Sequence, residues 1–241
     1  TLVLSPNEPG NQQHLQANQG KQSVVLDLKN PSAKEALLRL LKDSDVLISN
    51  VRPQAMARLG LSYDDLKALN PRLIHVSCCG FDQAGPYAAK PAYDDLIQGA
   101  TGVPWLSQQY GGGEPAYAPM TLGDRVTGLH AVYAVTTALY ARERSGQGQA
   151  VVVPMFEAMT QFILGDHLAG LSFEPPMGGA GYARLLTEHR KPYQTADGYL
   201  CVLIYNDKHW HSFFQAIGQP ERMQDPMFAT HTQRAAHIDA V

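Results

Sequence analysis

Residues 45–77 read DVLISNVRPQAMARLGLSYDDLKALNPRLIHVS, and this stretch indicates the fold. Short apolar runs rich in β-branched residues stand at its two ends, 45–49 and 73–77, and such runs are typical of buried strands. Between them, Ser62 can cap a short helix that continues to Leu69. A strand, a helix and a second strand in this order favour a parallel sheet, because parallel neighbours need a crossover connection.

The same alternation continues on both sides of this stretch. Apolar runs at 23–28 and 150–153 predict further strands. Residues 33–41 carry apolar side chains at helical spacing, and Ser32 and Glu35 ahead of them have the spacing of a capping box. The sequence therefore predicts an α/β fold: a Rossmann-like, mostly parallel sheet with flanking helices, plus a smaller α+β domain.

A long helix is predicted from Gly123 to about Gly146, where glycine is a common helix terminator. Its apolar residues are expected to share one face and to make the helix largely buried: Val126, Leu129, Val132, Val135 and Leu139.

The domain division is expected after residue 172. Prolines and glycines crowd the stretch 175–181, and beyond it residues 199–205 favour a strand and residues 208–217 a helix. We expect a large domain at 1–172, a linker at 173–192 and the start of a small domain at 193–241.

Composition limits the classes of function. The 241 residues are 44% hydrophobic and 17% charged, with a formal net charge of −3 and a pI near 6.3. This balance is typical of a folded protein without a general attraction for nucleic acid or acidic membranes, so an anionic ligand must meet a local cluster of cations. No apolar run approaches the ~20 residues of a membrane span. Three cysteines without C-x-x-C spacing predict neither a metal site nor disulfides, and fit a cytoplasmic protein.

Asp124 is the main candidate for chemistry, because it stands at the start of the long helix beside Gly123. Aspartate is a preferred helix N-cap, and that role alone explains its position. The positive end of a helix also favours an ionised carboxylate, and a neighbouring glycine leaves room for an acyl group. From position alone, capping and catalysis both stay open.

An ordered series of segments resembles the family III coenzyme A transferases, which include formyl and carnitine coenzyme A transferases and the related α-methylacyl-CoA racemases. The series covers nearly the whole chain: NQGKQSVVLDLK at 18–29, NVRP at 50–53, RLG at 58–60, LNPRLI at 69–74, GF at 80–81, GPY at 85–87, Gly123-Asp124 with Thr127-Gly128, RERSGQGQ at 142–149 and YQTADGY at 193–199.

The resemblance implies an enzyme that moves coenzyme A from an acyl-CoA donor to a carboxylic acid acceptor, with acyl-CoA as substrate and no metal. It implies that Asp124 is the nucleophile and that the protein is a homodimer, interlocked when full-length. A further set matches positions that line the coenzyme A site: Leu26, Lys29, Asn50, Val51, Arg58, Leu59, Tyr93 and Met155.

The resemblance also implies parts that are not recognised here. The family opens with a first strand and helix that contribute to the coenzyme pocket, and it continues well past Val241. A glycine-rich flap found in the formyl-transferase branch is not recognisable around 184–189.

Two other functions stay open. Racemases of the family carry a histidine before an aspartate, where this chain has Tyr93-Asp94, so a base poised near neutral pH is missing and transfer is favoured. Alternatively, the chain is a non-catalytic acyl-CoA-binding fragment or homologue.

Overall fold

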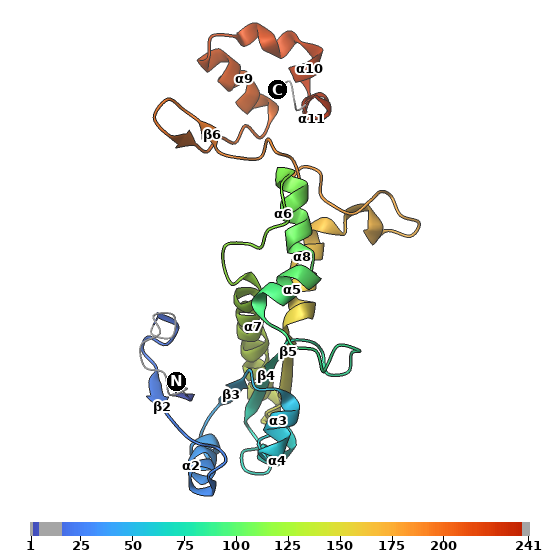
Figure 1. Cartoon of the computed structure of the whole chain (residues 1–241). Helices are drawn as coiled ribbons and strands as arrows, with labels where there is room; N and C mark the ends of the chain where they lie inside the picture. Colours follow the sequence, from blue (N-terminus) through green and yellow to red (C-terminus); the bar gives the residue numbers. More distant parts are fainter. Residues whose placement is uncertain (1, 5–15, 238–241) are drawn as a thin grey trace. The chain divides into compact units, whose positions relative to one another are not determined.

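The computed structural model describes residues 2–4 and 16–237. The chain forms two compact units, one made of Thr1–Val103 with Tyr117–Gly165, the other of Pro104–Ala116 with Asp166–Val241 (Figure 1). The domain division expected after residue 172 stays a prediction.

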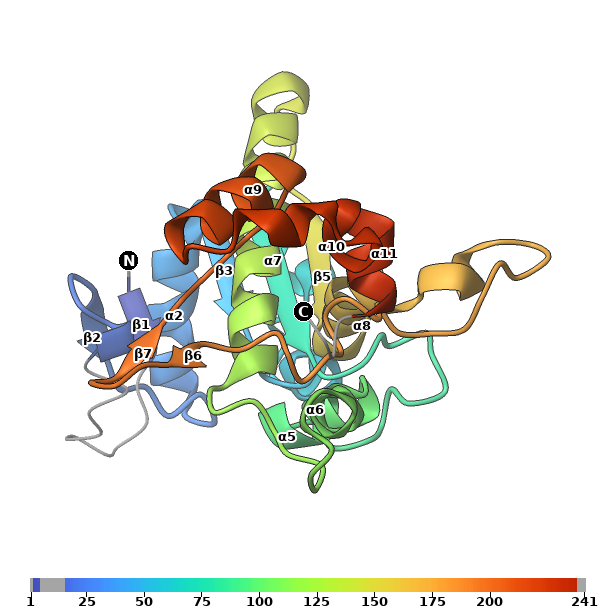
Figure 2. The ribbon, with the colours of Figure 1, turned by 90° about the horizontal axis from the view of Figure 1, so that it is seen from above.

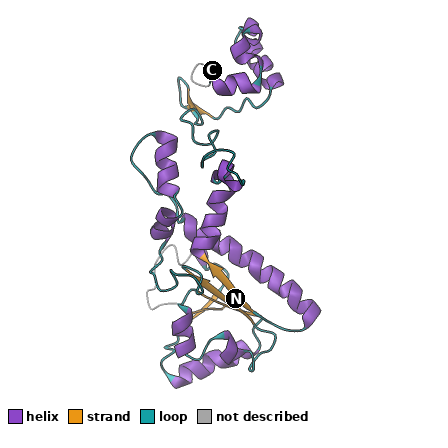
Figure 3. Ribbon diagram, turned by 90° about the vertical axis from the view of Figure 1, so that its right-hand side faces the viewer, coloured by secondary structure: helices purple, strands orange, loops and turns teal. Residues whose placement is uncertain are grey.

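The first unit is built on a parallel sheet of β3 (Val46–Ser49), β4 (Ile74–Cys79) and β5 (Ala150–Pro154), in the order β3-β4-β5 (Figure 3). Val46 pairs with Ile74, and His75 pairs with Ala150. The central strand is the most buried, since Ile74 and Val76 are fully enclosed. The α/β class and the parallel sheet are thus confirmed.

The predicted strand at 23–28 is shorter than expected and lies in a separate sheet. β2 (Gln22–Val24) pairs in parallel with β1 (Leu2–Leu4). Leu26 and Leu28 instead pack against a core cluster formed largely by helical residues. An apolar run can be drawn into a core from an extended loop as well as from a strand, and its composition alone does not distinguish the two.

Short helices connect and cover the strands: α2 (Pro31–Lys42), α3 (Pro53–Arg58), α4 (Tyr63–Leu66) and α5 (Asp94–Ala100). At α4 the predicted cap is confirmed, because the Ser62 hydroxyl accepts from the Asp65 N–H and the Asp65 carboxylate accepts from the Ser62 N–H. The helix ends at Leu66 rather than Leu69. At α2 the predicted cap is wrong: the Asn30 side chain accepts from the Ser32 N–H, because Pro31 starts the helix one residue before Ser32.

Helix α7 (Leu122–Ser145) runs along β4 and β5 (Figure 2) and ends where Gly146 adopts a left-handed conformation, with φ of 75°. The predicted bounds of this helix are confirmed, and the predicted face is right in part: Val126 is buried and Val135 and Leu139 pack on the core, but Leu129 and Val132 are 55% and 57% exposed. Each step of three residues falls about 60° short of a full turn, so a run of such steps winds around the helix. The buried residues of α7 are mostly small: Gly123, Val126, Thr127, Ala131, Ala138 and Arg142.

Arg142 joins the end of α7 to the sheet. Its side chain is only 8% exposed. The guanidinium donates to the Asp45 carboxylate at 2.9 Å, just before β3, and to the Arg72 carbonyl at 3.1 Å, just before β4. The charge is buried with an acidic partner, as a buried cation requires.

The second unit contains α6 (Val103–Gly111) from residue 104 onward, η1 (Ala169–Ser172), the antiparallel pair β6 (Tyr193–Gln194) and β7 (Tyr199–Leu200), α9 (Asp207–Ala216), η2 (Pro220–Gln224), α10 (Pro226–Ala229) and α11 (His231–Ala236). The helix predicted at 208–217 is confirmed. The strand predicted at 199–205 is limited to two residues. Phe214 and Phe228 are buried against each other, with ring centroids 5.3 Å apart.

Gly148 offers a test of the contact between the segment after α7 and the start of β4. An added Cβ at Gly148 would lie 2.1 Å from the Leu73 carbonyl oxygen, which is backbone and cannot move aside alone. We expect Gly148→Ala to lower the free energy of unfolding by ~2 kcal/mol or more, measured by urea denaturation.

Gly128, in the interior of α7, is the matched control because an added Cβ there meets nothing within 4 Å. Gly128→Ala is expected to raise stability by up to about 1 kcal/mol through helix propensity. Equal losses from both substitutions would contradict the close approach at Gly148.

Candidate active site

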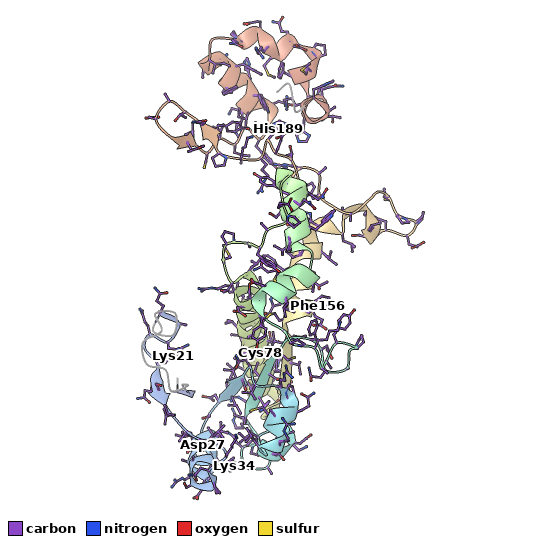
Figure 4. All side chains as sticks on the ribbon, in the orientation of Figure 1. Lys21, Asp27, Lys34, Cys78, Phe156 and His189 are labelled. Atoms are coloured by element: carbon purple, nitrogen blue, oxygen red, sulfur yellow. The ribbon has the colours of Figure 1, made fainter. Side chains whose placement is uncertain are left out.

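The candidate site lies where the strands of the parallel sheet end. β4 ends at Cys79, and the next residue, Gly80, accepts a hydrogen bond from the Phe156 N–H at 3.0 Å (Figure 4 labels Phe156). Helix α8 (Met155–His167) begins directly after β5. The carboxyl edge of an open parallel sheet is the usual location of ligand sites in α/β proteins.

Gly80 brings a second segment to this edge. An added Cβ at Gly80 would lie only 2.0 Å from the Cβ of Ala92. Ala92 therefore occupies the space that a side chain at residue 80 would need. This close approach holds Tyr93 and Asp94, the next residues along the chain, near the end of β4.

Gly123 brings the first turn of α7 to the same place. An added Cβ there would lie 3.2 Å from the Asp94 carboxylate oxygen Oδ1, 3.5 Å from the Met155 sulfur and 3.7 Å from Ile97 Cγ2. The starts of α5, α7 and α8 thus meet around Gly123. Two predicted site residues, Asp124 and Met155, come together at this point.

Asp124 is the third residue of α7, so its expected role as N-cap is wrong. The helix starts at Leu122, and the residue in the cap position, Thr121, makes no side-chain capping hydrogen bond. A carboxylate from another helix instead accepts a hydrogen bond from a backbone N–H in the first turn of α7: Asp94 Oδ1 accepts from the Asp124 N–H at 2.9 Å. The Asp124 carboxylate is left available for another use.

The electrostatic surroundings of Asp124 also differ from the expectation. Partial burial, and then the neighbouring charge of Asp94, raise the pKa of Asp124 above its ordinary value, while Arg125 acts in the opposite direction. Burial and a like charge both disfavour the ionised form of a carboxyl group, and together they outweigh the effect of Arg125. The carboxylate of Asp124 is more basic than that of an isolated aspartate.

The predicted coenzyme residues of the first unit gather in part around one apolar cluster. Leu26 and Leu59 both pack against it; its buried members are Leu37, Leu41, Met56, Leu61, Leu66 and Leu73. Lys29, three residues after Leu26, and Arg58, directly before Leu59, are both exposed, and the Lys29 N–H donates to the Asp27 carboxylate at 3.0 Å.

A cation that the sequence prediction missed reaches the same region. An added Cβ at Gly60 would lie 2.9 Å from the Lys34 Nζ, so this amine of α2 (labelled in Figure 4) lies close to the backbone just after Arg58 and Leu59. Its signal in the sequence was weak, because a lysine on an amphipathic helix is usually a solvated residue.

The other predicted residues lie at the edge of the sheet and on α5. Asn50 and Val51 follow β3 and are exposed, and the Val51 N–H donates to the Ser49 hydroxyl at 3.0 Å. Tyr93 precedes α5 and is 73% exposed. The ligand roles of all these residues stay predictions.

Two residues of α5 were missed as parts of the site, namely Asp94 and Gln98. Gln98 is fully buried and donates to the Asp94 carboxylate at 2.6 Å. Their spacing of four residues on a helix was the available signal. Their hydrogen bonds to residues 118, 120 and 124 join positions 20 to 30 residues apart in the chain, and helical spacing does not reveal such contacts.

The cysteines near the site are poor nucleophiles. Burial, followed by the charges of Glu157 and Asp82, raises the pKa of Cys79 to about 11. Burial also raises the pKa of Cys78. At neutral pH these thiols stay protonated and are therefore poor nucleophiles.

Within 2–4 and 16–237, no three or more His, Cys, Asp or Glu side chains are grouped to hold a metal ion. In the same residues, no helix has the length and apolar character needed to cross a membrane.

Comparison with known proteins identifies the family. Residues 4–241 match the model of CoA-transferase family III, and the chain belongs to this family. It is 34% identical over 226 residues to a succinate–glutarate CoA-transferase of Agrobacterium fabrum, covering 91% of this chain and 55% of that protein. It is 34% identical over 232 residues to an acetyl-CoA:oxalate CoA-transferase of Acetobacter aceti, covering 93% of this chain and 58% of that protein.

Among solved structures, a CaiB/BaiF family protein from Brucella suis is similar, with a TM-score of 0.74 and 30% sequence identity over 92% of this chain and 59% of that chain. The chain therefore spans somewhat more than half the length of these relatives.

The raised pKa of Cys79 predicts slow alkylation. With a pKa of about 11, about one Cys79 thiol in 10⁴ is ionised at pH 7, and the reactive fraction rises about tenfold with each pH unit up to ~11. Iodoacetamide labelling followed by peptide mass spectrometry measures this rate. Cys201 is exposed and serves as the internal control. Labelling of Cys79 as fast as Cys201 at pH 7 would contradict the negative, partly buried surroundings described above.

Proposed function

We propose that this chain is the catalytic part of a coenzyme A transferase in which Asp124 carries the acyl group and then coenzyme A. Membership of CoA-transferase family III supports this, as do relatives named as transferases for succinate, glutarate and oxalate. The observation that carries the proposal is the position of Asp124: its backbone N–H is held by Asp94, the residue is exposed, and the pKa of its carboxyl group is raised above the ordinary value.

The reaction begins when an oxygen of the Asp124 carboxylate attacks the thioester carbonyl of the donor. The carbon–sulfur bond breaks, coenzyme A leaves as a thiolate, and a mixed anhydride remains on the enzyme. The thiolate then attacks the aspartyl carbonyl of the anhydride, which releases the donor carboxylate and leaves an Asp124–coenzyme A thioester.

The acceptor completes the cycle. Its carboxylate attacks the aspartyl thioester carbonyl, coenzyme A leaves again as a thiolate, and a second anhydride forms. Attack of the thiolate on the acceptor carbonyl gives the new acyl-CoA and regenerates the Asp124 carboxylate. Each step is a substitution at a carbonyl, so no metal or redox partner is required.

Positioning must supply much of the rate, because a carboxylate is a weak nucleophile. Effective molarities for well-oriented groups reach ~10⁵ M or more. The raised pKa of Asp124 adds to this effect, since a carboxylate that is poorly stabilised as an anion is a better nucleophile. Water must be kept from the anhydride, which would otherwise be hydrolysed.

Coenzyme A binding is proposed for the surface around Leu26 and Leu59. Both leucines pack on the same cluster. The exposed cation Lys29 follows Leu26 by three residues, and the exposed cation Arg58 directly precedes Leu59. Cations of this kind make charge-assisted hydrogen bonds to phosphates. Asn50, Val51, Tyr93 and Met155 complete the proposed set along the edge of the sheet and the start of α5 and α8.

The wider setting follows the family resemblance. We expect a cytoplasmic homodimer that acts on acyl-CoA and a carboxylic acid. Apolar residues exposed on α7, among them Leu129, Val132 and Tyr133, are consistent with a protein partner on that face.

Asp124→Ala is expected to abolish transfer and to leave the fold intact, because it removes the nucleophile and none of the hydrogen bonds that hold the start of α7. With acyl-CoA and no acceptor, the unsubstituted protein should form an acyl or coenzyme A adduct that hydroxylamine traps on Asp124. Intact-mass and peptide mass spectrometry read both results. Normal turnover by the Ala variant would rule out Asp124 as the nucleophile.

The same incubation in D₂O separates transfer from racemisation. A racemase forms no adduct and exchanges the proton on the carbon next to the thioester for deuterium. Adduct without exchange is expected. Rapid exchange with no adduct would support the racemase, and neither signal would support a non-catalytic protein.

Lys29→Ala and Arg58→Ala are each expected to raise the Kd for acyl-CoA by roughly tenfold at low salt, or ~1.4 kcal/mol, and by less in strong salt, where phosphate contacts are screened. Isothermal titration calorimetry at two salt concentrations measures this. Lys67→Ala is the control, since Lys67 is an exposed lysine of the same unit that pairs with Asp64 at 2.6 Å. If all three variants bind alike at low salt, Lys29 and Arg58 do not contact the coenzyme.

A further inference from the structure

Gln98 is an unusual core residue. Its side chain is 0% exposed, although an amide is costly to bury unless its hydrogen bonds are made. It lies one turn after Asp94 on α5, the helix that packs against α7. An apolar residue of the same size would fill this space without the free-energy cost of removing an amide from water. The presence of glutamine therefore suggests that its hydrogen bonds have a role.

Two of those hydrogen bonds go to the segment just before α7, and the third goes to Asp94 on α5. The amide nitrogen donates to Asp94 Oδ2 at 2.6 Å and to the Met120 carbonyl at 3.2 Å, and the amide oxygen accepts from the Ala118 N–H at 2.9 Å. The orientation of the amide is fixed by these partners, because a flipped amide would oppose an oxygen to two acceptors. Gln98 therefore holds the segment just before α7 at two backbone points.

Asp94 closes the arrangement on the other side. Its Oδ1 accepts from the Asp124 N–H at 2.9 Å, while its Oδ2 is held by Gln98. Residues 118, 120 and 124 are thus tied to one turn of α5 on both sides of the helix start. We call Asp94 and Gln98, with these hydrogen bonds, the α5 clamp.

The clamp leaves the carboxylate of Asp124 itself untouched. It fixes the backbone of Asp124, and it holds the negative charge of Asp94 beside the Asp124 carboxylate. The other charge acting on Asp124 is Arg125 of α7. The acidic residue in the first turn of α8, Glu157, is engaged elsewhere, accepting from the Asp82 N–H at 3.1 Å.

We propose that Gln98 is a positioning residue for the transferase, which acts through Asp94 to fix the place and the surroundings of the Asp124 nucleophile. This inference rests on the proposed function for its catalytic meaning, while the clamp itself can be measured without turnover.

The test uses the full-length protein with ¹³C-labelled aspartate, so that the Asp124 carboxyl can be titrated by NMR. Gln98→Met keeps the length and approximate volume of the side chain and removes its three hydrogen bonds. With the clamp lost, Asp94 is free to turn toward solvent, and the pKa of Asp124 should fall toward its ordinary value. Because a lower pKa means ionisation at lower pH, the acid limb of kcat should move to lower pH as well.

A double-mutant cycle makes the coupling specific. Asp94→Asn should lower the pKa of Asp124 in the native background and have at most half that effect in the Gln98→Met background. Asp95→Asn is the matched control, since it removes the same charge from the next, exposed residue of α5 and should leave the pKa of Asp124 unchanged. We expect kcat of Gln98→Met to fall by roughly 10- to 100-fold, with the Kd for acyl-CoA within about twofold, because misplacement of the nucleophile acts on the chemical steps.

The opposing result is clear. If Gln98→Met lowers the melting temperature but leaves the pKa of Asp124 and the effect of Asp94→Asn as in the native protein, Gln98 is a structural residue only and the inference is wrong. Should Gln98→Met fail to fold, Asp94→Ala decides: faster exchange of the Asp124 amide proton with a lower Asp124 pKa supports the clamp, and no change in either overturns it.

Failure of the proposed function is distinguishable from failure of the clamp. A native protein that forms no trapped adduct, yet shows the Gln98-dependent coupling, retains the clamp and loses the transferase assignment. A protein that forms the adduct without the coupling retains the transferase assignment and loses the clamp.

Discussion

The site depends on two places where the backbone must approach its neighbour without a side chain between them. At Gly80, Ala92 occupies the space of a missing Cβ, and at Gly123 the Asp94 carboxylate lies within 3.2 Å of that space. The first contact fixes the start of α5 against the end of β4, and the second fixes the start of α7 against α5. A larger residue at Gly80 would push α5 away from β4, and one at Gly123 would push α7 away from α5. The 24-residue helix and the central strand are closely packed and cannot shift to make room.

This geometry gives two neighbouring carboxylates different roles. Asp94 is bound by donors on both oxygens, one from Gln98 and one from the Asp124 backbone. Partial burial, and then the neighbouring negative charge of Asp94, raise the pKa of Asp124. Proteins give two similar acidic residues different functions by placing them in different environments. In the proposed reaction, one carboxylate holds the helix and the other attacks the thioester.

Much of the fold was predictable because its determinants are local. Apolar β-branched runs located β3, β4 and β5, and Gly146 marked the end of α7. The buried face of α7 was predictable only in part from the same residues: packing against β4 and β5 selected small side chains such as Ala131 and Ala138, and left Leu129 and Val132 exposed.

The site was predictable only in part, for a related reason. Family resemblance selected Asp124, but the role of Asp94 as the group that satisfies its N–H comes from a contact 30 residues away in the chain. Gln98 gave only the weak signal of its helical spacing from Asp94, because glutamine is ordinarily a surface residue and its burial depends on backbone partners at residues 118 and 120.

The arrangement carries a cost in stability that helps to explain its hydrogen bonds. A carboxyl group whose pKa is raised in the folded state binds its proton more tightly there than in the unfolded chain. At pH values above the raised pKa, the ionised Asp124 therefore lowers the free energy of unfolding. Placing Asp94 beside it adds repulsion. The hydrogen bonds of Gln98 and the Asp124 N–H to Asp94 offset this repulsion where it arises, and they do so without neutralising Asp124. A cation placed against Asp124 would stabilise the protein more, but it would lower the basicity on which a carboxylate nucleophile depends.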